Sequence, residues 1–67
     1  MTLDEAVATA GEQFDAAVLP ALRKLEVLLV AAGVDEDEAA RELLGWRVHV
    51  ATARAQLLER VCALAGG

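Results

Sequence analysis

Few side chains in this 67-residue chain could carry out chemistry, and those few stand alone. His49 is the single histidine and Cys62 the single cysteine. Trp46 stands three residues before His49, so the Glu-x-x-His pair of di-iron helical bundles is missing. One cysteine cannot form an internal disulfide or a zinc site built from cysteines of one chain. We therefore expect no bound metal and no cofactor.

Catalytic nucleophiles are also scarce. The sequence has no serine and no glycine-rich phosphate loop, which excludes two common kinds of active site. The acidic residues at 35–38 suit a helix start, and no loop of the calcium-binding type follows them. Cys62 lies on an apolar helical stripe, where we expect a buried, inert thiol; a redox role or a disulfide between two chains is the alternative. We do not expect an enzyme.

Composition and charge narrow the possible partners. Apolar residues make up 57% of the chain, but Phe14 and Trp46 are its only aromatic residues, so a core must be built from Ala, Leu and Val. The net charge of −5 opposes binding to nucleic acids and to anionic membranes. The N-terminus does not resemble a secretory signal, and we expect a cytoplasmic protein. The lack of Ile, Asn, Ser and Tyr is typical of a GC-rich genome, bacterial or phage.

The first half of the chain predicts one long helix, over about residues 3–32. Thr2 and Glu5 have the spacing of a capping box, which places the helix start near Leu3. Pro20 lacks an amide proton, so we expect a kink there, with a break into two helices as the alternative. An apolar stripe runs through the proline at helical spacing; its members are Leu3, Val7, Ala10, Phe14, Ala17, Ala21, Leu25, Leu28 and Ala32.

A turn over residues 33–35 separates this helix from a second one, predicted over about 36–64 and ending at Gly66-Gly67. Gly33 is typical of a helix C-terminus, and Asp35 with Glu38 forms a second capping box. Because the turn is short, the two helices must lie antiparallel. The fold class is therefore all-α, a helical hairpin that forms one domain over residues 1–67.

More apolar surface is present than one partner helix can cover. The second helix has one stripe that contains Leu44, Val48 and Leu58, and another that contains Leu43, Trp46 and Val50. The economical solution is a homodimer of hairpins, a four-helix bundle with coiled-coil-like packing. Packing against a different protein is the alternative. The predicted interface residues are Phe14, Leu19, Val27, Val30, Leu43, Trp46, Arg47, Val50, Arg54, Leu57 and Val61.

Two arginines and a strip of small residues complete the candidate contacts. Arg47 and Arg54 lie seven residues apart on one side of the second helix. They either bridge to carboxylates of a facing helix and fix the register, or remain solvated at the edge of the apolar face. A backbone could approach closely at a second strip, formed by Gly45, His49, Thr52 and Gln56.

The length, the two-helix layout and the acidic turn Val34-Asp35-Glu36-Asp37-Glu38-Ala39 resemble the plasmid Rop family. Its hairpins dimerise into a four-helix bundle that binds paired RNA hairpins, and Phe14 falls where that family would need an aromatic residue. The family's RNA face uses basic and amide side chains, whereas this chain has Ala10, Val18 and Leu25 there. The resemblance therefore implies the architecture and not the RNA-binding function.

We expect a non-catalytic module that binds protein surfaces, beginning with a copy of itself, as an accessory subunit, adaptor or regulator of a larger protein. A Rop-like RNA-binding regulator and a metal or redox helical bundle are the alternatives.

Overall fold

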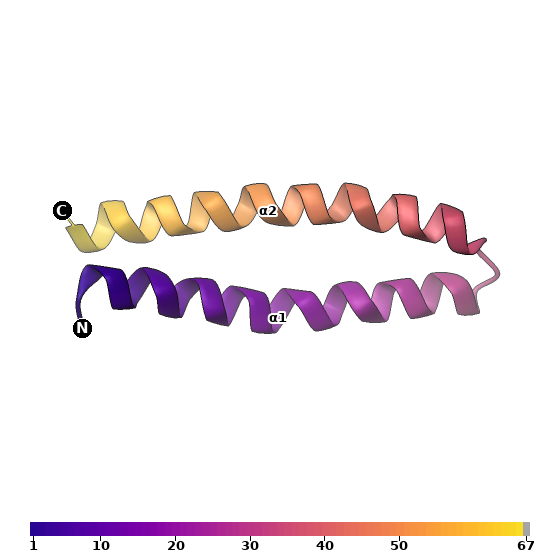
Figure 1. Ribbon diagram of the computed structural model, residues 1–67, viewed down its shortest axis with the longest axis horizontal. Coiled ribbons are helices and arrows are strands. Elements are labelled where there is room, and N and C mark those ends of the chain that lie inside the picture. The colour runs from indigo at the N-terminus through magenta and orange to yellow at the C-terminus, as the bar shows by residue number, and fades with distance from the viewer. Residues whose placement is uncertain (67) are drawn as a thin grey trace.

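The computed structural model describes residues 1–66, which form two helices joined by a short turn. Helix α1 spans Leu3–Ala31 and helix α2 spans Glu36–Gly66. The helices lie side by side and antiparallel, so both ends of the hairpin meet at the same end of the rod (Figure 1). The Cα atoms extend over 49 × 16 × 11 Å. The predicted all-helical hairpin is confirmed; Gly67, at the predicted end of the second helix, lies outside the described residues.

Helix α1 begins at the cap that the sequence predicts. Thr2 has extended backbone angles, and its hydroxyl oxygen accepts a hydrogen bond from the amide of Glu5 at 3.1 Å. The hydroxyl therefore satisfies one of the amides that have no partner within the first helical turn. The helix then continues through Pro20. The alternative of two separate helices was therefore wrong, while the expected kink stays a prediction.

The turn closes with a glycine in the left-handed region. Gly33 has φ of 95°, which a residue with a Cβ atom rarely adopts. Its amide donates to the carbonyl of Val30, and the amide of Val34 donates to the carbonyl of Leu29, both at 3.0 Å. These two bonds define a Schellman motif, which satisfies carbonyls that the end of α1 would otherwise leave without partners.

Asp35 caps α2, but not in the predicted way. A capping box would pair Asp35 with the amide of Glu38. Instead, the Asp35 carboxylate accepts a hydrogen bond from the amide of Asp37 at 3.1 Å. Glu36, Asp37 and Glu38 occupy the first turn, where negative charge is stabilised by the positive end of the helix dipole.

The core is one narrow seam between the helices. Its buried apolar side chains among the described residues are Leu22, Ala39 and Leu43, which are 8%, 1% and 3% exposed. Around them, buried or half-buried residues continue the seam along both helices: Val7, Gly11, Phe14, Val18, Leu25, Leu29, Val50, Leu58 and Val61. Neither helix is long and apolar enough to cross a membrane.

The seam on α1 differs from the predicted stripe by about one residue. Ala17, Ala21 and Leu28 belong to the predicted apolar stripe but are exposed, and Val18, Leu22 and Leu29 face α2 in their place. Two adjacent rows of α1 are apolar, so periodicity alone does not choose between them. The row with the larger side chains packs inward, because it removes more apolar surface from water.

Candidate interaction surface

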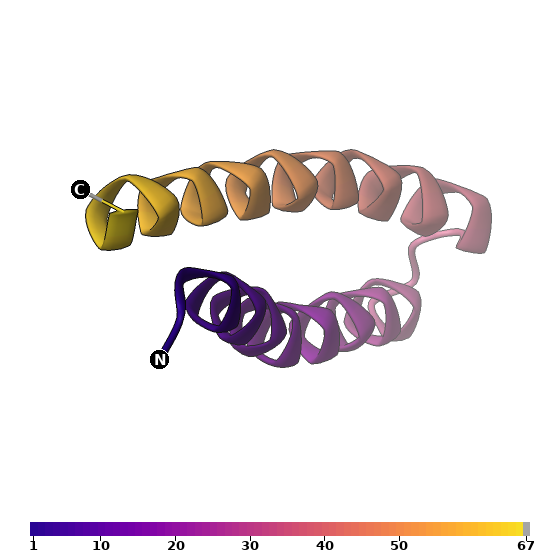
Figure 2. The same ribbon diagram turned by 60° about the vertical axis from the view of Figure 1, so that its left-hand side comes forward.

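Two exposed faces flank the seam, one on each side of the hairpin. A helix turns by about 100° per residue, so residues that directly precede seam positions lie on one flank and those that directly follow them lie on the other. In an antiparallel pair, the preceding residues of both helices share one side and the following residues share the other. The hairpin is a single layer of two helices, and no other described element covers either side (Figure 2).

The first surface, which we name the Trp46 face, is built from residues that precede seam positions. Near the turn it has Leu28 and Trp46, whose side chains are 65% and 48% exposed. The indole nitrogen of Trp46 donates to the Glu42 carboxylate at 3.1 Å. The centroids of the His49 and Trp46 rings lie 5.7 Å apart, and the ring planes make an angle of 55°. The members of this face are Leu3, Ala10, Ala17, Ala21, Leu28, Trp46, Ala53, Leu57 and Leu64.

Small side chains occupy the middle of the Trp46 face. Ala17 and Ala21 on α1 and Ala53 on α2 are all exposed. Leucine side chains lie toward the termini, and Leu28 and Trp46 toward the turn. Because alanine lets helix backbones approach closely, this centre can accept the helices of another hairpin at the short separations of a helical bundle.

The opposite surface, which we name the Leu44 face, is built from residues that follow seam positions. Leu44 and Val48 are 64% and 62% exposed. Its apolar members are Leu19, Val30, Leu44, Val48, Ala51, Ala55 and Cys62. We expected the thiol of Cys62 to be buried, and this was wrong for the hairpin: Cys62 is exposed. Helix α1 covers only the neighbouring row of α2, which contains Leu43, Val50 and Val61.

Arg54 and Asp15 join the two helices on the Leu44 side of the seam. The Nε atom of Arg54 lies 2.9 Å from one carboxylate oxygen of Asp15, and an outer nitrogen of the same guanidinium lies 3.2 Å from the other. The predicted bridge from Arg54 to the facing helix is therefore present. Arg47 is exposed and makes no ion pair with any residue that the structure describes.

The predicted interface residues do not share one face. Leu43 is buried within the hairpin itself, and Phe14, Val50, Arg54 and Val61 are half-buried along the seam.

The exposed members of that prediction are divided. Trp46 and Leu57 lie on the Trp46 face, Leu19 and Val30 lie on the opposite side, and Val27 lies on the outside of α1, remote from the seam. Leu28, Ala53 and Leu64 also lie on the Trp46 face and were not among the predicted interface residues, because the prediction did not separate the two flanks.

The strip of Gly45, His49, Thr52 and Gln56 is exposed on the outside of α2. A Cβ atom added at Gly45 would meet no atom within 4 Å, so the strip is open. The Thr52 hydroxyl donates to the carbonyl of Val48 at 3.1 Å, within its own helix. A second backbone therefore has access to this strip, and its use for binding stays a prediction.

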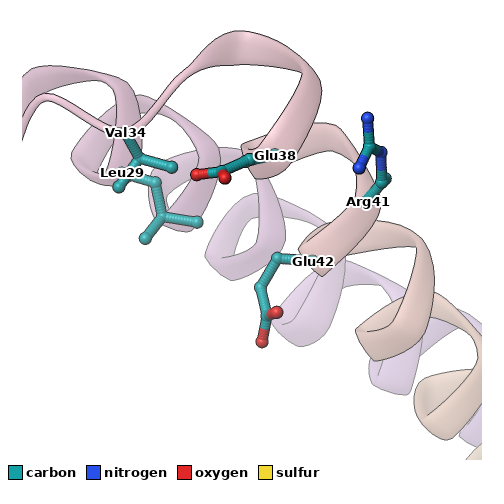
Figure 3. A pocket seen from close by; sticks show the side chains of 5 residues that line it. All are labelled: Leu29, Val34, Glu38, Arg41 and Glu42. Carbon is teal, nitrogen blue, oxygen red and sulfur yellow. The ribbon is translucent and has the colours of Figure 1, made fainter.

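A shallow hollow lies where the turn meets α2. Leu29, Val34, Glu38, Arg41 and Glu42 line it. Leu29 and Val34 lie next to each other, while Arg41 and Glu42 point in different directions (Figure 3). An apolar contact between these two turn positions commonly accompanies a Schellman motif, which explains the hollow's apolar floor without a ligand.

Within residues 1–66, no three His, Cys, Asp or Glu side chains gather in a way that could hold a metal ion. The chain matches no protein-family model, and no curated protein or solved structure is similar enough to count as a match.

Proposed function

We propose that this chain is a non-catalytic protein-interaction module that dimerises through the Trp46 face into a four-helix bundle and acts as an accessory subunit, adaptor or regulator of a larger protein. The observation that carries the proposal is the amount of apolar surface left outside the seam. Among the described residues, eleven large apolar side chains are exposed and three apolar residues are buried. Five of the exposed side chains share the Trp46 face: Leu3, Leu28, Trp46, Leu57 and Leu64. Apolar surface gathered on one face usually marks an interface.

The hairpin is large enough to form a stable dimer through one of its broad sides. Each broad side measures 49 by 16 Å between Cα atoms. A standard protein interface takes roughly 800 Å² from each partner, which an outline of this size can provide. Two such faces would enclose a second apolar layer, which a single hairpin of this length lacks.

Charge favours a second copy on this face. The charged side chains beside its apolar residues are Lys24, Glu38, Glu42 and Arg60. Two basic groups and two acidic groups balance, so two copies would meet without strong repulsion. A kink at Pro20, which we include in the proposal, would curve α1 around the partner helices.

The test compares two alanines that lie two residues apart on α2. Ala53 is on the Trp46 face and Ala55 on the Leu44 face, and both are exposed. We expect light scattering to give a dimer mass for the original chain and for Ala55→Arg. Ala53→Arg should give a monomer, because it would bury a charge without a partner at the interface.

A monomer for the original chain at all concentrations would overturn the proposal, and so would a dimer that survives Ala53→Arg. Circular dichroism of both variants shows whether each remains helical. A dimer that binds a structured RNA hairpin at low salt would instead favour the Rop-like function.

A further inference from the structure

We propose that the Leu44 face binds an amphipathic helix of a different protein, one with lysines or arginines along the edges of its apolar stripe. The inference rests on the proposed function, because it takes the opposite face to be occupied by a second copy. It adds the chemistry of the second partner.

The apolar part of the Leu44 face has the length and spacing of a helix-binding surface. On α2 it runs from Leu44 to Cys62, which is about 27 Å at 1.5 Å per residue. Leu19 and Val30 border it on α1, and both are exposed. Side chains at such spacing form ridges into which the side chains of another helix can pack.

A line of carboxylates borders this strip along α1. Glu5, Glu12 and Glu26 share one line with Leu19, at spacings of seven residues or multiples of seven, and all are exposed. On the Leu44 side, six carboxylates stand against four guanidinium groups. The acidic residues are Glu5, Glu12, Asp15, Glu26, Asp37 and Glu59, and the basic ones are Arg23, Arg41, Arg47 and Arg54.

One of the four basic groups is already neutralised. Arg54 binds Asp15 through two hydrogen bonds, so its charge does not offset the other carboxylates. Lys24, the one lysine, lies on the Trp46 side of α1. The acidic excess of the hairpin's flanks is therefore concentrated on the Leu44 side.

This asymmetry selects the occupant. A twofold contact places the same patch of both copies together, so two Leu44 faces would bring two negative surfaces into contact. A helix with basic edges would place opposite charges beside the acidic line while its apolar stripe covers Leu44, Val48 and Ala51. Charge complementarity of this kind raises association rates and selects among partners.

The experiment uses the full chain and two labelled 18-residue helical peptides. Both have the same Leu and Ala stripe; one has lysines at the flanking positions and the other has glutamines. We expect fluorescence anisotropy at low salt to show at least tenfold tighter binding of the lysine peptide. The difference should shrink at high salt, because exposed charges are screened.

Three variants locate the site. Ala55→Arg should remove binding of the lysine peptide, and the double variant Glu12→Gln, Glu26→Gln should weaken it severalfold with little effect on the glutamine peptide. Ala53→Arg, on the opposite face, should leave peptide affinity within about twofold, since the peptide does not touch that face. These positions are exposed, and circular dichroism checks that each variant remains helical.

Equal affinity for the two peptides would overturn the inference, as would no binding at all. A loss of self-association in Ala55→Arg would also overturn it, because a second copy would then occupy the Leu44 face. If Ala53→Arg stays dimeric while Ala55→Arg loses the peptide, the proposed dimer face is wrong and the peptide site stands.

Discussion

Gly11 provides the space that the guanidinium of Arg54 occupies over α1. A Cβ atom built on Gly11 would lie 2.6 Å from an outer nitrogen of Arg54 and 3.3 Å from its central carbon. The same guanidinium binds Asp15, one turn further along α1. Glycine in the middle of a helix usually lowers stability relative to alanine. At Gly11 this loss is opposed by the contact between the helices that Arg54 makes.

Two glycine substitutions measure how these two effects change the free energy of unfolding. Gly45→Ala should raise the free energy of unfolding by about 0.5–1 kcal/mol, because nothing lies within 4 Å of the new methyl group. Gly11→Ala should give a smaller gain or none, since the Arg54 guanidinium must move away from Asp15. In an Arg54→Ala background, Gly11→Ala should recover the gain seen at Gly45.

Urea unfolding followed by circular dichroism gives these values at one protein concentration. Asp15 and Arg54 are about 41% and 39% exposed, so their pair is expected to contribute no more than about 1 kcal/mol. Equal gains for Gly11→Ala and Gly45→Ala in the original chain would show that the Arg54 contact has no energetic effect.

The ends of the two helices are defined by local hydrogen bonds that need no tertiary contact. Thr2 caps α1, Asp35 caps α2, and the Schellman bonds of Gly33 and Val34 close the turn. The turn fixes the antiparallel arrangement, because only three residues lie between Ala32, which caps the C-terminus of α1, and Glu36, the first residue of α2. The antiparallel order of the two helices therefore follows from local interactions.

Gly33→Ala tests the turn. With φ of 95°, an alanine at this position would be strained, and we expect a loss of about 1 kcal/mol in the free energy of unfolding. Gly45→Ala, the same substitution inside α2, should act in the opposite direction. Thermal unfolding of the two variants gives the comparison. A stabilising effect of Gly33→Ala would mean that the turn adopts another conformation in solution.

At the scale of the whole molecule, the hairpin has one seam and two uncovered sides. A chain of 67 residues buries a modest fraction of its surface, and this one leaves Val27, Leu28, Val48 and Leu64 more than 60% exposed. The stability of such a hairpin should depend on whatever covers those sides. Folding and association are then linked through mass action.

That linkage predicts a midpoint of thermal unfolding that depends on protein concentration. We expect the midpoint of the original chain to rise as concentration increases, because a dimer is favoured by mass action. Ala53→Arg should unfold at a lower temperature with no such dependence, and Ala55→Arg should behave like the original chain. A midpoint that is independent of concentration in the original chain would contradict the linkage.

The sequence by itself determined the elements of this protein. Caps, the turn glycine and helical periodicity act over a few residues, so Thr2, Gly33 and Asp35 predicted both helices and their antiparallel order. The seam could not be predicted in the same way, because two adjacent rows of α1 are apolar. Only packing in three dimensions selected Val18, Leu22 and Leu29 over Ala17, Ala21 and Leu28.

The same limit applies to the candidate surfaces. Sequence spacing indicated that the apolar surface exceeded what one hairpin can bury, and it singled out Trp46, Leu19 and Arg54. It did not show that Trp46 and Leu19 lie on opposite sides, or that Arg54 binds Asp15 within the chain. Those facts depend on how each helix is rotated about its own axis, and side chains distant in sequence decide that rotation when they pack together.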